Sequence, residues 1–158
     1  MVKNGVKTVG FIGFNDPFGE NWHTVFNAQA QKAGIRIVAS ERYLRSDGSV
    51  TGQVAKLMAA KPDAVLVAAA GGPTVLPHTT LIDAGYSVIS WQGVRRDESH
   101  NRRDAKLFER IGRGLYHFRP IIHWTAQQTI DFSLARGLRL NRLYTEGFDR
   151  VGCMPCIN

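Results

Sequence analysis

Apolar residues in the first part of the chain fall into short continuous runs separated by longer amphipathic stretches. Short apolar runs that end in glycine or a turn are typical of strands buried on both faces. These runs lie at Thr8–Gly13, Arg36–Ala39 and Ala64–Ala69. Helices are predicted after each of them, at about residues 19–32, 51–60 and 74–84. Repeated strand–helix units with short loops predict a parallel sheet with right-handed crossovers.

The pattern changes near residue 86. Ser87–Trp91 is a fourth apolar run, where such a sheet would take its next strand. The chain from Val94 to Arg119 is charged and poor in apolar periodicity, so a loop is expected there, with some helix at Asp104–Ile111. A last helix is predicted at Ala126–Arg136, with Thr125 as its N-cap.

We therefore predict the α/β class: a three-layer domain around a parallel sheet of about four strands, with a partly irregular C-terminal extension. Residues 1–86 and 87–158 differ in texture, but no Pro/Ser-rich linker separates them. We expect both segments to form one compact domain. We interpret Trp91, Phe118 and Trp124 as core residues under the fourth strand.

The net charge of +7 is concentrated in the second segment. Residues 1–86 carry eight basic and six acidic side chains, whereas residues 87–158 carry twelve and seven, and eleven of those twelve are Arg. The guanidinium fork matches phosphate and carboxylate oxygens, so this segment suits an anionic ligand. A solvated basic face is the alternative. No basic helix or aromatic-interleaved stripe indicates a specific nucleic-acid partner.

The apolar runs are too short to cross a bilayer, and residues 1–7 lack the features of a signal peptide. We therefore expect a cytoplasmic protein without a membrane partner. Cys153 and Cys156 form a single Cys-x-x-Cys, which is half of a metal site or a redox dithiol. Four ligands are usual for zinc or an iron–sulfur cluster, so no cofactor is expected unless a dimer supplies four cysteines.

Residues 7–86 resemble the Leu/Ile/Val-type substrate-binding proteins of ABC transporters. The resemblance is carried by KTVGFIGFNDPFGENW (7–22), GIRIVASERYLRSDGSVTGQVAKLMAAKPDAVLVA (34–68) and LIDAGY (81–86). It implies the sheet-and-helix core of one lobe of a periplasmic-binding-protein-like fold, in which strand-end loops line an amino-acid cleft. Those loops would contribute Asn15, Asp16, Phe18, Gly71 and Gly72. Plain strand-to-helix turns are the alternative interpretation.

Residues 87–158 resemble the phosphoadenylyl-sulfate (PAPS) and adenylyl-sulfate reductases, particularly their phage-type relatives. The resemblance is carried by WQGVRRDESHNRR (91–103), FRPIIHW (118–124) and NRLYTEGFDRVGCMPCIN (141–158). In that family the arginine-rich stretch helps to hold the anionic nucleotide. The resemblance implies this role for Arg95, Arg96, Ser99 and Arg102. A charged loop without a ligand is the alternative.

The chain departs from the reductase pattern at the positions that carry chemistry. The family holds the nucleotide phosphates on a Ser-Gly-Gly-x-Asp-Ser loop after the first strand, where this chain has Gly13-Phe14-Asn15-Asp16-Pro17. Cluster-bearing members use an upstream cysteine pair, and no cysteine precedes Cys153 here. The reductase nucleophile is not found either, so no catalytic residue is assigned.

Three functions follow as hypotheses. The first is an incomplete sulfonucleotide-reductase-like module that binds adenylyl sulfate or another anionic nucleotide weakly, without reductase activity of its own. The second is a protein-interaction or structural module, formed by natural or artificial recombination, whose apolar cleft surface and sheet edges take a protein partner. The third is an amino-acid-binding lobe.

Overall fold

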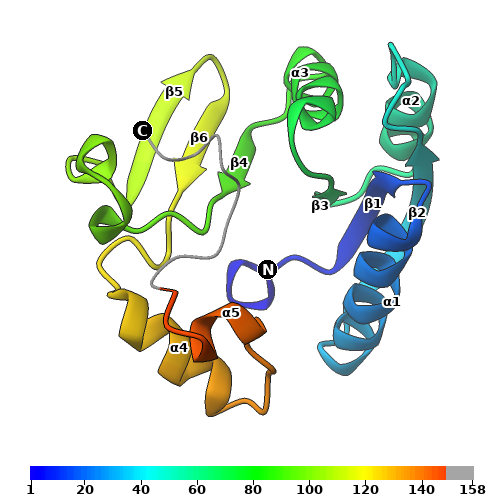
Figure 1. Ribbon diagram of the computed structural model, residues 1–158. Helices are drawn as coiled ribbons and strands as arrows, with labels where there is room; N and C mark the ends of the chain where they lie inside the picture. The colour runs from blue at the N-terminus through cyan, green and yellow to red at the C-terminus, as the bar shows by residue number, and fades with distance from the viewer. Residues whose placement is uncertain (149–158) are drawn as a thin grey trace. The chain divides into compact units, whose positions relative to one another are not determined.

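The computed structural model describes residues 1–148 and separates into two compact units, Met1–Val88 and Ile89–Asn158 (Figure 1). The division falls two residues beyond the change in texture at residue 86. Among the described residues, no helix is both long and apolar enough to span a membrane.

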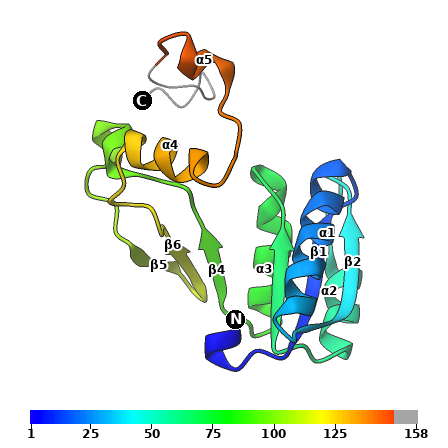
Figure 2. The same cartoon turned by 90° about the horizontal axis from the view of Figure 1, so that it is seen from below.

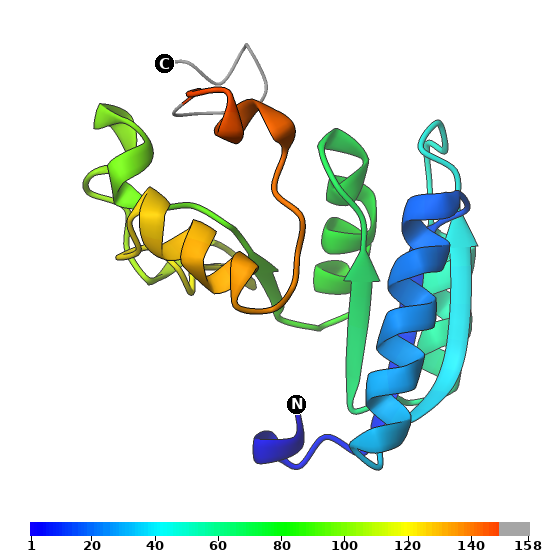
Figure 3. The same cartoon turned by 60° about the horizontal axis from the view of Figure 1, so that its bottom comes forward.

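The first unit is a parallel sheet between helices. Its strand order is β2-β1-β3, with β1 at the centre. Helix α1 lies against one face of the sheet, and α2 and α3 lie against the other (Figure 3). Three side chains of β1, Phe11, Ile12 and Phe14, are fully buried, as a strand covered on both faces requires. The elements are β1 (Thr8–Phe14), α1 (Pro17–Lys32), β2 (Arg36–Tyr43), α2 (Thr51–Ala59), β3 (Ala64–Ala68) and α3 (Val75–Asp83), with short 3-10 turns at Val2–Asn4 and Gly72–Thr74.

A carboxylate joins the beginnings of two neighbouring strands of this sheet. Oδ2 of Asp63 accepts hydrogen bonds from the backbone N–H groups of Lys7 (2.9 Å) and Thr8 (2.8 Å) and from the Thr8 hydroxyl (3.0 Å). Because these donors favour the ionised form, the pKa of Asp63 lies below its usual value. The contact sets the register of β1 against β3, in which Val9 lies opposite Ala64.

The second unit contains its own sheet of three strands, in the order β4-β6-β5 (Figure 2). Strands β5 and β6 form an antiparallel hairpin in which Phe108 lies opposite Phe118 and Glu109 opposite His117. The elements are β4 (Val88–Trp91), β5 (Phe108–Gly112), β6 (Leu115–Phe118), α4 (Ala126–Leu134), α5 (Arg142–Thr145) and two 3-10 turns, η3 (Arg96–Glu98) and η4 (His100–Arg102).

The α/β class is confirmed, but the sheet of about four parallel strands is wrong. Its first three strands form as predicted, whereas β4 joins the second sheet instead. The helix predicted at Asp104–Ile111 is also wrong, since the second half of that range lies in β5 and the first half is not helical, and β6 lies in the predicted loop. The physical reason is the β5–β6 hairpin, because it supplies β4 with a hydrogen-bonding neighbour outside the parallel sheet.

Candidate functional site

The arginine-rich segment follows β4 and folds into the two 3-10 turns η3 and η4. The backbone N–H of Gln92 donates to the Phe118 carbonyl (2.9 Å), and that of Arg96 donates to the Ile122 carbonyl (3.0 Å). These two bonds fix the segment between the end of β6 and the turn before α4. The backbone of all four predicted anion-binding residues is therefore held by the second unit's own framework.

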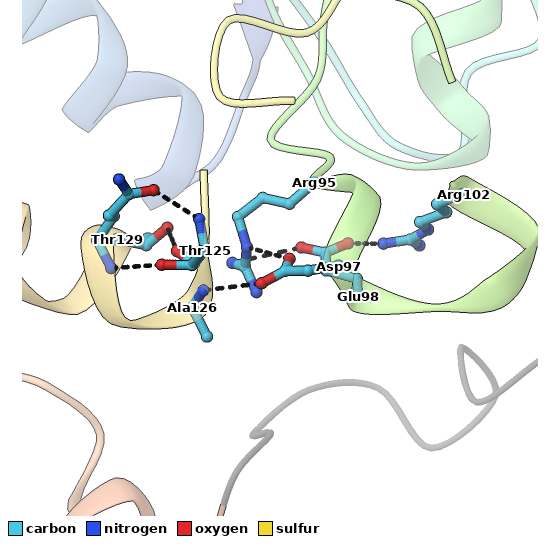
Figure 4. A network of polar contacts seen from close by, with 8 residues as sticks. Arg95, Asp97, Glu98, Arg102, Thr125, Ala126 and Thr129 are labelled. Atoms are coloured by element: carbon cyan, nitrogen blue, oxygen red, sulfur yellow. Dashed lines mark hydrogen bonds and ion pairs between the residues drawn. The ribbon is translucent and has the colours of Figure 1, made fainter. Parts of the chain in front are cut away.

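Two of the four predicted residues converge on a carboxylate of their own segment. Nε of Arg95 pairs with Oδ1 of Asp97 at 3.0 Å, and its Nη1 lies 3.5 Å from Oε1 of Glu98 (Figure 4). The other oxygen of Glu98 pairs with Nη1 of Arg102. Glu98 thus bridges Arg95 and Arg102, and the carboxylates offset the charge of both guanidinium groups.

Asp97 also connects this segment to helix α4. Its Oδ2 accepts a hydrogen bond from the backbone N–H of Ala126 (2.9 Å), one of the donors that a helix N-terminus leaves unsatisfied (Figure 4). The predicted N-cap Thr125 is confirmed, and it forms a full capping box with Gln128. The Arg95–Asp97 pair therefore contributes to the folding of the unit.

Arg96 differs from Arg95 and Arg102. Its side chain is exposed, and its Nε donates to the Ala105 carbonyl at 2.9 Å. Within residues 1–148 it has no ion pair, which leaves both terminal amino groups of its guanidinium available to a ligand. Ser99, which ends η3, is partly buried, and its backbone carbonyl accepts from the Arg102 N–H at 3.0 Å.

The most buried cation among the described residues of the unit is Arg119, which no sequence motif indicated. Only 9% of its surface is exposed. Its guanidinium donates to Oε1 of Gln92 (2.9 Å), to the Lys106 carbonyl (2.9 Å) and to Oε2 of Glu109 (3.0 Å), and its Nη2 lies 2.9 Å from Nδ1 of His117. The acceptors come from β5, β6, the residue that follows β4 and the loop before β5, so no local sequence motif indicates the cluster.

His117 serves this cluster as a hydrogen-bond acceptor. Burial lowers the pKa of His117, and the neighbouring Arg119 lowers it further, although Glu109 acts in the opposite direction. A neutral imidazole suits the geometry because Nδ1 then accepts from the Arg119 guanidinium. His117 is therefore part of the internal network of the sheet.

The cleft loops predicted in the first unit lie at the carboxyl ends of its parallel strands. Asp16 caps α1 by accepting from the Gly19 N–H at 3.0 Å and pairs with Nε of Arg45 at 2.7 Å. The Gly19 bond and the Arg45 contact lower the pKa of Asp16. The backbone N–H of Asn15 donates to the Tyr43 carbonyl at 2.8 Å. Both residues thus hold the turn, as the plain-turn alternative expects.

The other loop of that edge is held by a buried phenol. The Tyr43 hydroxyl donates to the Pro73 carbonyl at 3.2 Å, and burial raises the pKa of Tyr43 to about 12. Gly71 has a φ of +69°, which favours glycine, and Gly72 begins the 3-10 turn that follows. Phe18 is partly exposed and packs against Phe14 with 6.1 Å between ring centroids.

The predicted half metal site, Cys153 and Cys156, lies outside the described residues. Among residues 1–148, no three His, Cys, Asp or Glu side chains are grouped so that they could hold a metal ion. The described part of the chain therefore offers an anion a guanidinium at Arg96 and offers a metal no cluster of ligands.

Relatives and solved structures point to two different groups of proteins. An uncharacterized 37.8 kDa protein of Escherichia phage 186 is 42% identical over 87 residues, which is 53% of this chain and 25% of the relative. An adenosine 5'-phosphosulfate reductase of Neisseria meningitidis serogroup A is 35% identical over 65 residues, 40% of this chain and 27% of that enzyme. The chain thus spans about a quarter of the length of these relatives.

The similar solved structures are receptors. The structure of an extracellular ligand-binding receptor from Rhodopseudomonas palustris HaA2 is 47% identical, with a TM-score of 0.55, and the match covers 59% of this chain and 26% of the receptor. A periplasmic binding protein from Burkholderia mallei shares the fold, with a TM-score of 0.50 and 23% identity over 53% of this chain and 22% of that protein. Both resemblances stated from the sequence are thereby confirmed.

The family model of the phosphoadenosine phosphosulfate reductase domain matches residues 26–158, which is most of the chain and includes the whole arginine-rich segment. The chain belongs to the phosphoadenosine phosphosulfate reductase domain family.

Proposed function

We propose that this chain is a sulfonucleotide-reductase-like module that binds adenylyl sulfate, or a related anionic nucleotide, weakly and through Arg96. The observation that carries the proposal is the difference in ion pairing among the arginines of this segment. Arg95 and Arg102 are neutralised by Asp97 and Glu98, whereas Arg96 keeps its charge and two terminal amino groups for a ligand. Family membership supports a sulfated or phosphorylated nucleotide as that ligand.

Each of the four residues then has a separate role. Arg96 would contact the sulfate or phosphate directly, and the Ser99 hydroxyl, one 3-10 turn later, would be a second donor. Arg95 and Arg102 act as positioning residues because they hold Asp97 and Glu98 and thereby the turn that carries Arg96. This assignment narrows the sequence hypothesis, in which all four residues shared one anion.

The affinity that follows is low. A contact between an exposed guanidinium and an anion contributes about 1 kcal/mol or less, and a hydrogen bond to a charged group about 1.5–3 kcal/mol. Together these contacts amount to at most roughly 4 kcal/mol, which corresponds to a Kd of about 1 mM or weaker. Binding should weaken as salt is added, because exposed charges are screened.

The test is a titration of the ¹⁵N-labelled chain with adenylyl sulfate at low salt, followed by amide NMR shifts. We expect millimolar saturation, with shifts centred on the amides of Arg96 and Ser99. Arg96→Glu should abolish these shifts, whereas the matched charge reversal Arg113→Glu, at a residue with no ion pair in residues 1–148, should preserve them. The proposal fails if the wild type shows no saturable shift, or if Arg96→Glu binds as the wild type does.

We further propose that binding is not followed by reduction. Support comes from the sequence, in which no cysteine precedes Cys153, so that no upstream pair can complete a cluster with Cys153 and Cys156 in one chain. Release of sulfite from adenylyl sulfate in the presence of a thiol reductant would refute this part of the proposal and leave the binding part intact.

A second candidate, amino-acid binding by the first unit, has one observation in its favour. The receptor from R. palustris that is 47% identical to this chain is a ligand-binding protein. Asp16 is already occupied by Gly19 and Arg45, however, so the loop offers few free polar groups. The same NMR titration with leucine, isoleucine and valine separates the two candidates, because shifts would then centre on Asn15, Phe18, Gly71 and Gly72.

A further inference from the structure

One face of the second unit's sheet is covered by aromatic rings. The Trp91 and Phe118 rings meet edge to face at 4.9 Å, Phe118 lies 6.5 Å from Phe108, and Phe108 stacks on Tyr116 at 5.4 Å and 19°. Two of these rings are largely open to solvent, Trp91 at 72% and Phe108 at 51% exposure. The four residues, from three strands, form a continuous row that we call the aromatic face.

The pleat of the hairpin separates this face from the polar network. Phe108 lies opposite Phe118, and Arg110 opposite Tyr116, so alternation of side chains places Arg110 beside the rings. Glu109 and His117 form the pair between them and project to the other face, where Arg119 engages both. The hairpin therefore places Arg110 on the aromatic face and its one carboxylate, Glu109, on the opposite face.

The second unit as a whole is positively charged, like Arg110 on the aromatic face. Residues 89–148 carry eleven basic and six acidic side chains. Lys106 precedes β5, and Arg113 lies in the hairpin turn. Neither side chain has an ion pair within the part of the chain that the structure describes. The aromatic face thus carries one cation, Arg110, and two more, Lys106 and Arg113, lie next to the hairpin strands, none of them in an ion pair within the described residues.

This charge decides between the occupants that an apolar face could take. A second copy of the chain, packed face to face, would bring Arg110 and the net positive unit against their own copies, and like charges in contact oppose association. A single-stranded nucleic acid has the complementary properties: unpaired bases stack on aromatic rings, and its phosphates attract Lys and Arg. A duplex hides its bases and offers only the phosphates.

We propose that the aromatic face is a sequence-tolerant binding surface for single-stranded nucleic acid. Bases stack on Trp91 and Phe108, the two most exposed rings, and Arg110, Arg113 and Lys106 contact the phosphates. The sequence contains no interleaved stripe because the rings lie at positions 91, 108, 116 and 118, and only the fold of three strands assembles them. The surface is distinct from the Arg96 site proposed above.

The test is fluorescence anisotropy of a labelled oligodeoxythymidylate of about twelve nucleotides, titrated with the whole chain at low salt. Loss of one stacking partner should weaken binding roughly tenfold, so we expect that effect from Trp91→Ala and again from Phe108→Ala. Trp91→Phe, which keeps a ring, should bind nearly as well as the wild type. The matched control is Trp22→Ala on α1, a tryptophan that is 48% exposed in the first unit and should have no effect.

Three results would overturn the proposal: no binding of the oligonucleotide at low salt, equal binding of the single strand and of its duplex, or unchanged affinity in both alanine variants. Concentration-dependent dimerisation abolished by Trp91→Ala, seen by sedimentation, would assign the face to a second copy instead. Circular dichroism serves as the control that each variant is folded. The two sites are tested separately. Arg96→Glu should lose the adenylyl sulfate shifts and Trp91→Ala should lose the oligonucleotide binding, and either result can be obtained without the other.

Discussion

Arg119 is the residue on which the second unit should depend most. It is 9% exposed and donates to Gln92, Lys106 and Glu109, which belong to different strands and loops. In Arg119→Met the side chain fills similar space but leaves three neutral acceptors, on Gln92, Lys106 and His117, and the Glu109 carboxylate without their donor. Glu109 keeps a third of its side chain exposed and regains some hydration, which reduces the cost.

The magnitude follows from these contacts. A lost hydrogen bond to a charged group costs about 1.5–3 kcal/mol, and each buried acceptor left unsatisfied costs about 1–3 kcal/mol. After the discount for Glu109 we expect a loss of about 3–4 kcal/mol. A unit of about seventy residues is stable by roughly 4–10 kcal/mol, so Arg119→Met should consume a large part of its stability. The stability of Arg119→Lys should lie between those of the wild type and Arg119→Met, because an ammonium keeps the charge but lacks the planar fork.

The assay is urea unfolding in a Trp22→Phe background, so that fluorescence reports only Trp91 and Trp124 of the second unit. The control is Arg113→Met, an exposed residue in the hairpin turn, which should change stability by no more than about 0.5 kcal/mol. If Arg119→Met and Arg113→Met unfold at the same urea concentration, the buried cluster is not what holds the sheet together and the reasoning fails.

Two further predictions concern the first unit and the pH response. A Cβ on Gly19 would lie 1.9 Å from the Phe14 carbonyl oxygen, so Gly19→Ala should destabilise the first unit by at least about 3 kcal/mol. Gly52→Ala, with nothing within 4 Å, should be nearly neutral. Both are measured by urea unfolding in a Trp91→Phe, Trp124→Phe background, in which Trp22 reports the first unit. The lowered pKa of His117 means that the unfolded chain binds its proton first. The second unit should therefore keep its full stability above about pH 6.5 and lose it as the pH falls below that value. His117→Gln should flatten this dependence over pH 5–7, and an unchanged slope would show that another group is responsible.

The elements of the first unit follow from local sequence because its central strand is buried on both faces and its helices are amphipathic. Continuous apolar runs such as Thr8–Phe14 and the turn residues Asp16 and Pro17 then indicate strand, cap and helix without knowledge of the rest. In the second unit, Glu109 and Arg110 place charges inside β5. Glu109 is neutralised by Arg119, which follows another strand, β6, so the local pattern resembled a charged loop or helix.

The exposure of the aromatic side chains also depends on pairing between distant segments. Trp91 and Phe118 are apolar, and apolar residues beside a strand are normally buried, so a core position was the reasonable expectation. Trp91 is instead 72% exposed because β4 pairs with β6, and the row of rings lies on a face of that sheet that the described residues of the second unit leave open. That interpretation of Trp91 was wrong.

The sequence by itself determined the residue types that carry chemistry: an arginine-rich segment suited to an anion, two family resemblances and the α/β class. It could not determine which arginine is left without an ion pair, because that depends on where Asp97 and Glu98 point once η3 forms. Nor could it place β4, since a strand's partner is chosen by the hydrogen-bonding edges that distant segments offer. The local pattern of a segment determines the secondary structure that the segment prefers. Ion pairs and strand pairs are formed between segments, and only the tertiary structure brings those segments together.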